Sequence, residues 1–189
     1  VIMIYSASNV WALYKFNDAF KFVKHQGMFL VVGLFLLYFI SKMPYFNYYS
    51  KANKILLTII ILLILVIIPG IGTVRNGSRS WFGIGSFGFQ PSEAAKIGLL
   101  IFTAKYLVNN EKNLKDIKKG VLPILGVIFL IFGLIMLQPD FGTGVIIVIS
   151  TIGLLFVGGV NFKFFIRLGI LGVIGVIILI LIAPYRLER

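Results

Sequence analysis

The sequence predicts an all-α, polytopic bundle of membrane-spanning helices. Of the 189 residues, 59% are hydrophobic and only 13% are charged, and the mean hydropathy is +1.02. A soluble domain is about half apolar and about a quarter charged. The apolar residues also gather in uncharged runs at 55–68, 121–137 and 168–183. Such runs are apolar on every face of a helix, which is typical of segments surrounded by lipid.

About six complete spans and a partial one at the start are expected. Each complete span has about 15 to 20 residues, close to what a hydrocarbon layer of about 30 Å requires. The 94–108 span is the least regular, because it contains Lys96 and Lys105. Since the chain opens on Val1 and ends in a loop-like segment, we expect one transmembrane domain over 1–189, incomplete at both ends. The expected spans are 1–8 (partial), 27–43, 55–71, 94–108, 121–137, 142–160 and 165–184.

The net charge of +12 does not indicate nucleic-acid binding, because the basic residues lie in short segments between apolar runs. One side of the membrane would carry Lys42, Lys51, Lys54, Lys105, Lys112, Lys115, Lys118, Lys119, Lys163 and Arg167. The other would carry Lys15, Lys21, Lys24, Arg75, Arg79, Arg186 and Arg189. The richer side is expected to be cytoplasmic. Residues 9–26, 72–93 and those after Arg189 are therefore expected outside.

Residues 83–88 read Gly-Ile-Gly-Ser-Phe-Gly and match a dinucleotide-binding pattern. That site needs a preceding strand and an acidic residue about twenty positions later. The segment lies between membrane spans, and no acid lies near Lys105. We therefore expect a tight, glycine-rich outer loop. Its aromatic residues would lie at the membrane–water boundary, where such rings are favoured.

Residues 90–96 read Gln-Pro-Ser-Glu-Ala-Ala-Lys and predict the start of a helix. Pro91 precedes it, Ser92 could cap it, and Glu93 suits the positive end of the helix dipole. Glu93 and Lys96 lie three residues apart and share a face. A lysine inside a span faces a partner or a watery cavity. A functional cavity and a structural ion pair both remain open.

Residues 138–144 read Gln-Pro-Asp-Phe-Gly-Thr-Gly and join two spans with almost no loop. Asp140 could cap the following helix or stand as an acid at the outer mouth of a cavity. Both interpretations remain open from spacing alone. His25 is the sole histidine and there is no cysteine, so no metal site is expected from these ligand types.

Several motifs, in order along the whole chain, resemble those of the SEDS family. The resemblance is closest to its FtsW and SpoVE branch, and less close to RodA. It rests on Tyr5–Ser8, Gly77–Trp81, Phe89–Glu93 with Lys96, Ala104–Leu107, Gln138–Thr143 and Ala183–Leu187. The resemblance implies a bundle of about ten helices, with about seven in this chain and the first truncated.

The resemblance also implies a function. SEDS proteins polymerise lipid II into peptidoglycan strands at the outer face of the bacterial plasma membrane, in cell division or cell-shape maintenance. Their partners are a class B penicillin-binding protein and other division or elongation membrane proteins. Substrate and cavity residues carried over are Arg79, Gln90, Glu93, Lys96, Gln138 and Asp140.

The catalytic aspartate of the family is expected beyond Arg189, so no catalytic residue is expected in this chain, and the chain alone is expected to be inactive. A divalent cation, Mg²⁺ or Mn²⁺, is expected to help neutralise the pyrophosphate, although no residues here indicate a metal site. A lipid II flippase or transporter is an alternative, but no internal repeats or broken helices are evident. A non-catalytic scaffold of the division machinery is another, but it has no need of Glu93 and Lys96 inside the membrane.

The expected orientation can be tested with single cysteines, because the sequence contains none. A cysteine placed within 75–89 should react with a membrane-impermeant thiol reagent in intact cells. One placed within 112–119 should react only after permeabilisation, since the basic segment is expected in the cytoplasm. Labelling of the 112–119 segment in intact cells would reverse the orientation.

Overall fold

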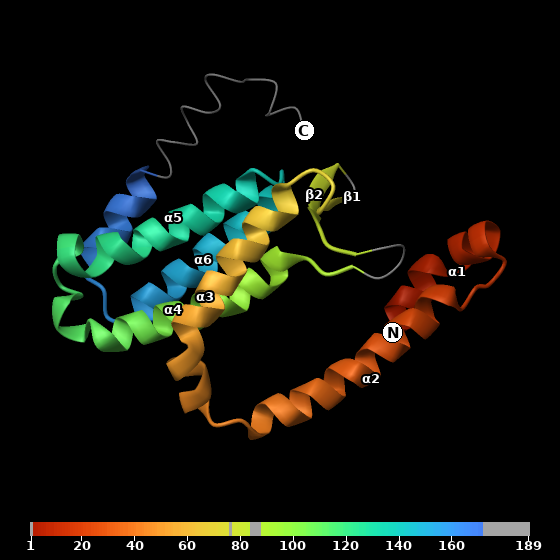
Figure 1. Ribbon diagram of the computed structural model, residues 1–189, viewed down its shortest axis with the longest axis horizontal. Helices are drawn as coiled ribbons and strands as arrows, with labels where there is room; N and C mark the ends of the chain where they lie inside the picture. Colours follow the sequence, from red (N-terminus) through yellow and green to blue (C-terminus); the bar gives the residue numbers. More distant parts are fainter. Residues whose placement is uncertain (1, 76, 84–87, 172–189) are drawn as a thin grey trace, which may run out of the picture. The chain divides into compact units, whose positions relative to one another are not determined.

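A computed structural model of the chain describes residues 2–75, 77–83 and 88–171, which are mostly helical (Figure 1). They form two compact units that divide after Asn47. Three described helical segments are long and apolar enough to cross a membrane, namely Lys21–Lys42, Tyr45–Ile67 and Ile117–Met136. The predicted class, a helical membrane bundle, is confirmed. The part of the 165–184 span beyond residue 171 lies outside the described residues.

The first unit contains α1 (Ile2–Phe16) and α2 (Lys21–Lys42), which pack against each other. Helix α1 continues well beyond the expected end near residue 8 and stops where Asn17 adopts a φ of 54°. The Asp18 carboxylate then accepts hydrogen bonds from Lys24 Nζ and from Phe20 N, each at 2.9 Å. The bond from Lys24, with the backbone bond, holds the pKa of Asp18 below its ordinary value of 3.8.

The second unit contains α3 (Tyr45–Ile67, from Tyr48 onward), α4 (Pro91–Asn109), α5 (Leu122–Met136) and α6 (Phe141–Val157). A 3-10 turn (Glu111–Asn113) and a short π-helix (Ile117–Val121) connect α4 to α5, and residues 162–171 are again helical. Helix α6 packs against both α4 and α5, and α4 and α5 also contact each other (Figure 1). Backbone hydrogen bonds inside each helix leave its backbone compatible with lipid.

The core of this unit is built from aliphatic side chains on the facing stripes of the helices. Fully or nearly fully buried members include Leu63, Leu99, Ile124, Ile128, Ile131, Ile135, Ile147 and Leu155. Glycines let the helices approach closely, as small residues do in membrane proteins. At Gly98 an added Cβ would lie 2.0 Å from Ile59 Cδ1 of α3, so α3 and α4 meet there without space for a side chain.

A β-hairpin follows α3, where the sequence led us to expect only a glycine-rich loop. Its strands are β1 (Thr73–Arg75) and β2 (Ser78–Trp81), paired antiparallel with Arg75 opposite Ser78. Gly77 in the turn has a φ of 81°, which glycine adopts without strain. Residues 84–87 of the glycine-rich pattern lie outside the described residues. Because successive side chains of a strand point to opposite faces, Ser78 and Arg79 lie on different faces of β2.

Gly72, at the junction of α3 and the hairpin, should not tolerate a side chain. A Cβ there would lie 1.9 Å from the Val66 carbonyl oxygen, a backbone atom that no rotamer change can move. Gly72→Ala should lower the free energy of unfolding by about 1–3 kcal/mol, the usual cost of overpacking. Thermal denaturation of the purified full-length protein would measure this loss of stability.

The matched control is Gly126→Ala in α5, where a Cβ meets nothing within 4 Å. The control should be neutral or stabilising by about 0.5–1 kcal/mol, and equal destabilisation by both changes would contradict the packing described.

Candidate polar site at the helix ends

Gln138 ties three segments together at the end of α5. Its side chain is fully buried, and its Nε2 donates to the carbonyl oxygen of Leu63 in α3 at 3.3 Å. The backbone carbonyl oxygen of Gln138 accepts a hydrogen bond from the Ser78 hydroxyl of β2. Ser78 Oγ also lies 3.0 Å from Ser80 Oγ. Because one hydroxyl carries one proton, Ser80 donates in that contact when Ser78 donates to Gln138.

Gln90 and Asp140 join the first turns of α4 and α6. Gln90 Nε2 donates to Asp140 Oδ2 at 2.7 Å, and both residues are partly buried. The other oxygen of Asp140 accepts from the Thr143 amide at 3.3 Å and caps α6. The capping interpretation of Asp140 is therefore confirmed, and the carboxylate also holds a residue from a distant helix. A hydrogen bond to a charged group contributes about 1.5–3 kcal/mol.

The expected cap of α4 by Ser92 is wrong. The helix begins at Pro91, its N-cap residue is Gln90, and the Gln90 side chain makes no capping hydrogen bond. Proline is favoured as the first helical residue, which moves the helix start ahead of Ser92. Ser92 instead lies on the buried face of α4, and its hydroxyl has no hydrogen-bond partner among the described residues.

Glu93 and Lys96 form an ion pair on the first turns of α4, with 2.7 Å between Glu93 Oε2 and Lys96 Nζ. The side chain of Glu93 is 55% exposed and that of Lys96 is 27% exposed. A helical pair of this kind stabilises by about 0.2–0.5 kcal/mol when solvent surrounds it. The ionic contact between these two residues matches the sequence pattern, and whether they face a substrate cavity stays a prediction.

Arg79 is the arginine of the hairpin that has no partner among the described residues. Its side chain is partly buried, its Cγ lies close to Gly72, and its guanidinium has no hydrogen-bond or ion-pair partner among the described residues. Arg75, by contrast, lies over the Trp81 ring with its Cζ 5.0 Å from the ring centroid. The two arginines of the hairpin therefore differ. The Arg75 guanidinium stacks on an aromatic ring, whereas the N–H donors of Arg79 make no hydrogen bond among the described residues.

We call the six residues that the sequence predicts to contact a substrate the outer polar cluster, after the side of the membrane on which they are expected. They are Arg79, Gln90, Glu93, Lys96, Gln138 and Asp140. The N-termini of α4 and α6 add partial positive charge, and both carboxylates are already partnered. Among the described residues, no three His, Cys, Asp or Glu side chains could together hold a metal ion. The residues present therefore do not fit a resident divalent cation.

The structure brings Gln90 to Asp140 and Glu93 to Lys96, and it links the hairpin that carries Arg79 to Gln138 through Ser78. Sequence reasoning missed the roles of Ser78 and Thr143. A signal for the hairpin was present, because the dipeptide Asn76-Gly77 is favoured in the two-residue turns of hairpins. No signal could have paired Gln90 with Asp140, which are 50 residues apart.

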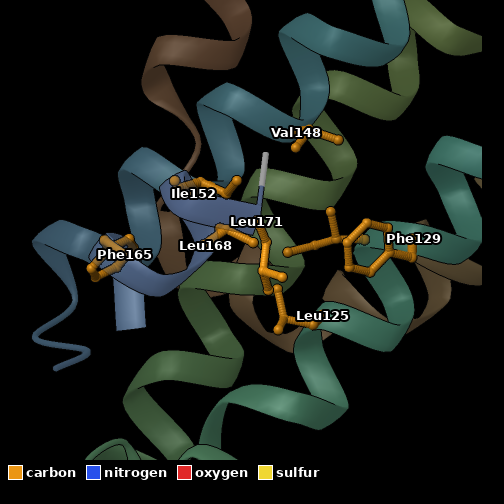
Figure 2. A pocket seen from close by; sticks show the side chains of 9 residues that line it. Leu125, Phe129, Val148, Ile152, Phe165, Leu168 and Leu171 are labelled. Atoms are coloured by element: carbon orange, nitrogen blue, oxygen red, sulfur yellow. The ribbon is translucent and has the colours of Figure 1, made fainter. Parts of the chain in front are cut away.

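A separate cavity of about 630 Å³ lies between α5, α6 and residues 162–171 (Figure 2). Figure 2 shows Leu125, Phe129 and Leu168 pointing into it. Every residue that lines it is apolar or glycine, and none belongs to the outer polar cluster. The cavity offers no group for acid–base or anion chemistry.

Comparison with known proteins gives a family for the whole chain. The family of cell cycle proteins named after FtsW, RodA and SpoVE matches residues 1–189. Stage V sporulation protein E of Bacillus subtilis is 44% identical over 189 residues, which cover all of this chain and 52% of that protein. A probable peptidoglycan glycosyltransferase FtsW of Saccharophagus degradans is 37% identical over 191 residues, 49% of its length. The chain thus spans about half the length of the curated relatives it matches.

Solved structures agree with this assignment. The rod shape determining protein RodA of Thermus thermophilus has a TM-score of 0.65 at 29% identity, covering 79% of this chain and 48% of RodA. A chain from a peptidoglycan synthase complex, solved for its coordination of polymerization and crosslinking, has a TM-score of 0.70 at 25% identity. That match covers 100% of this chain and 54% of the other. With the family match extending over every residue, the chain belongs to the FtsW, RodA and SpoVE family of multi-pass bacterial membrane proteins.

Proposed function

We propose that the protein is a peptidoglycan glycosyltransferase. It would polymerise lipid II into glycan strands at the outer face of the plasma membrane, in cell division or cell-shape maintenance. The observation that carries the proposal is the Gln90–Asp140 bond, which brings two residues of the outer polar cluster together from the starts of α4 and α6. Two relatives at 37% and 32% identity bear the name of probable peptidoglycan glycosyltransferase, which supports the reaction class.

The outer polar cluster suits a pyrophosphate linked to sugars. Arg79 can donate two parallel hydrogen bonds to phosphate oxygens, because its guanidinium is a planar fork of donors. The N-terminus of α4 supplies further positive potential, as helix N-termini do for phosphates. Gln90 uses its Nε2 toward Asp140, so its Oε1 can accept a hydrogen bond from a sugar hydroxyl.

The proposal places substrate contacts on this chain and leaves the general base outside it. Asp140 accepts hydrogen bonds from Gln90 and Thr143, and Glu93 is paired with Lys96. A base should have a pKa matched to its task and reach the proton that it takes. Both carboxylates are thus already engaged by partners within this chain. No step is assigned to a divalent cation, because the described residues do not fit one.

The proposed partner is a class B penicillin-binding protein, with other membrane proteins of division or elongation around it. The solved relative in a peptidoglycan synthase complex supports a partner of this kind. Cross-linking by the partner would follow polymerisation by this protein. A lipid flippase or a scaffold would be the better description if purified full-length protein and its partner, given lipid II, formed no glycan strands.

Arg79→Lys should reduce polymerisation of lipid II by about 10- to 100-fold at low substrate. The change keeps the charge but removes the two-oxygen fork, and a hydrogen bond to a charged group contributes about 1.5–3 kcal/mol. Gel separation of glycan strands made by the full-length protein would measure the rate at several lipid II concentrations.

The matched control for Arg79→Lys is Arg167→Lys. Arg167 is exposed, and its side of the membrane is expected to be cytoplasmic. The control should polymerise at the normal rate. Normal polymerisation by Arg79→Lys at every substrate concentration would contradict the proposed phosphate contact, and a complete lack of polymer from the unmodified protein would contradict the proposed function.

A further inference from the structure

A second cavity, of about 550 Å³, lies as a groove between α3 and α4. Its α3 wall follows one face of the helix, from Tyr48 through Ile55 to Leu62. Its α4 wall is formed by Ala94, Ile97, Gly98 and Ile101. The Thr58 hydroxyl in this wall donates to the Lys54 carbonyl at 2.9 Å, so it needs no further partner. Away from its two lysines, the groove therefore suits an apolar occupant.

One end of the groove is cationic. Lys51 and Lys54 line it and are exposed, and neither takes part in an ion pair among the described residues. Helix α3 contains no acidic residue that could neutralise them. Lys105 of α4 lies near the same end, with its Nζ 5.2 Å from the centroid of the Tyr49 ring. Three positive charges therefore adjoin one end of an apolar channel.

The groove depends on the close approach of the two helices. Gly98 forms part of the wall, and its missing side chain brings Ile59 of α3 against the backbone of α4. The groove is thus apolar along its length and basic at one end. The distribution of lysines predicts that this end lies at the cytoplasmic leaflet. Basic pockets between helices on this side of a membrane bind anionic lipid headgroups.

We propose that the α3–α4 groove binds an anionic phospholipid of the cytoplasmic leaflet, with one acyl chain along the apolar walls and its phosphate between Lys51 and Lys54. A free phosphate would use only the lysines and would leave the apolar walls empty. A zwitterionic lipid would fill the walls but would present a compensating positive charge to the lysines. The charge and the shape of the groove together favour the anionic lipid. The site is independent of the proposed lipid II chemistry at the opposite helix ends.

The test is photocrosslinking of the full-length protein in nanodiscs. The probes are phosphatidylglycerol and phosphatidylcholine that carry the same diazirine in one acyl chain. Phosphatidylglycerol should form adducts in peptides from α3 and α4 several-fold more efficiently than phosphatidylcholine. Lys51→Gln with Lys54→Gln should lower the apparent affinity for phosphatidylglycerol about 25-fold, at about fivefold for each lysine near an anionic surface. Adducts with phosphatidylcholine should change little.

The matched control is Lys112→Gln with Lys115→Gln, which removes the same charge from exposed lysines that are expected on the same side of the membrane. This variant should retain the α3 and α4 adducts. Ile97→Trp, which fills the groove from α4, should remove them for both probes. The proposal is overturned if the two lipids label α3 and α4 equally, or if the control pair of substitutions abolishes the adducts as fully as the Lys51 and Lys54 pair. It is also overturned if no lipid adducts map to these helices.

Discussion

The hydrogen bond from Gln90 to Asp140 sets the arrangement of the second unit at its polar end. Helices α5 and α6 are separated by only a few residues. Asp140 is the last of these residues, and its carboxylate both caps α6 and accepts the hydrogen bond from Gln90. Polar groups at the edge of a membrane are costly when they lack partners. Gln90 meets that requirement from α4, and Gln138 makes separate hydrogen bonds to α3 and to the hairpin.

The helices could be predicted from sequence because lipid leaves a continuous apolar segment few alternatives to a helix. The Glu93–Lys96 contact could be predicted as well, since helical spacing alone sets it. The start of α4 could not be placed correctly by the capping preference of Ser92, because Pro91 at the first helical position prevailed. The Gln90–Asp140 contact depends on how α4 packs against α6, and no local pattern contains that information.

Helix α4 connects the two ends of the unit. Its first turn carries Gln90 and the Glu93–Lys96 pair, its middle carries Gly98, and its last turns bring Lys105 beside Tyr49. One helix therefore contributes to the outer polar cluster proposed to hold lipid II and to the groove proposed to hold an anionic phospholipid. The contact between Gly98 and Ile59 lies between them along α4 and forms part of the groove.

The most direct test of this account is a double-mutant cycle on Gln90 and Asp140. Gln90→Met removes the donor with little change of shape, and Asp140→Ser keeps a residue that can cap α6 but cannot reach Gln90. Free energies of unfolding of the full-length protein in bicelles would be measured for both single variants and the double variant. The account predicts a coupling free energy of about 1.5 kcal/mol or more, as for a hydrogen bond to a charged group. If the losses of unfolding free energy in the two single variants sum to the loss in the double variant within about 0.5 kcal/mol, the two residues do not hold α4 and α6 together.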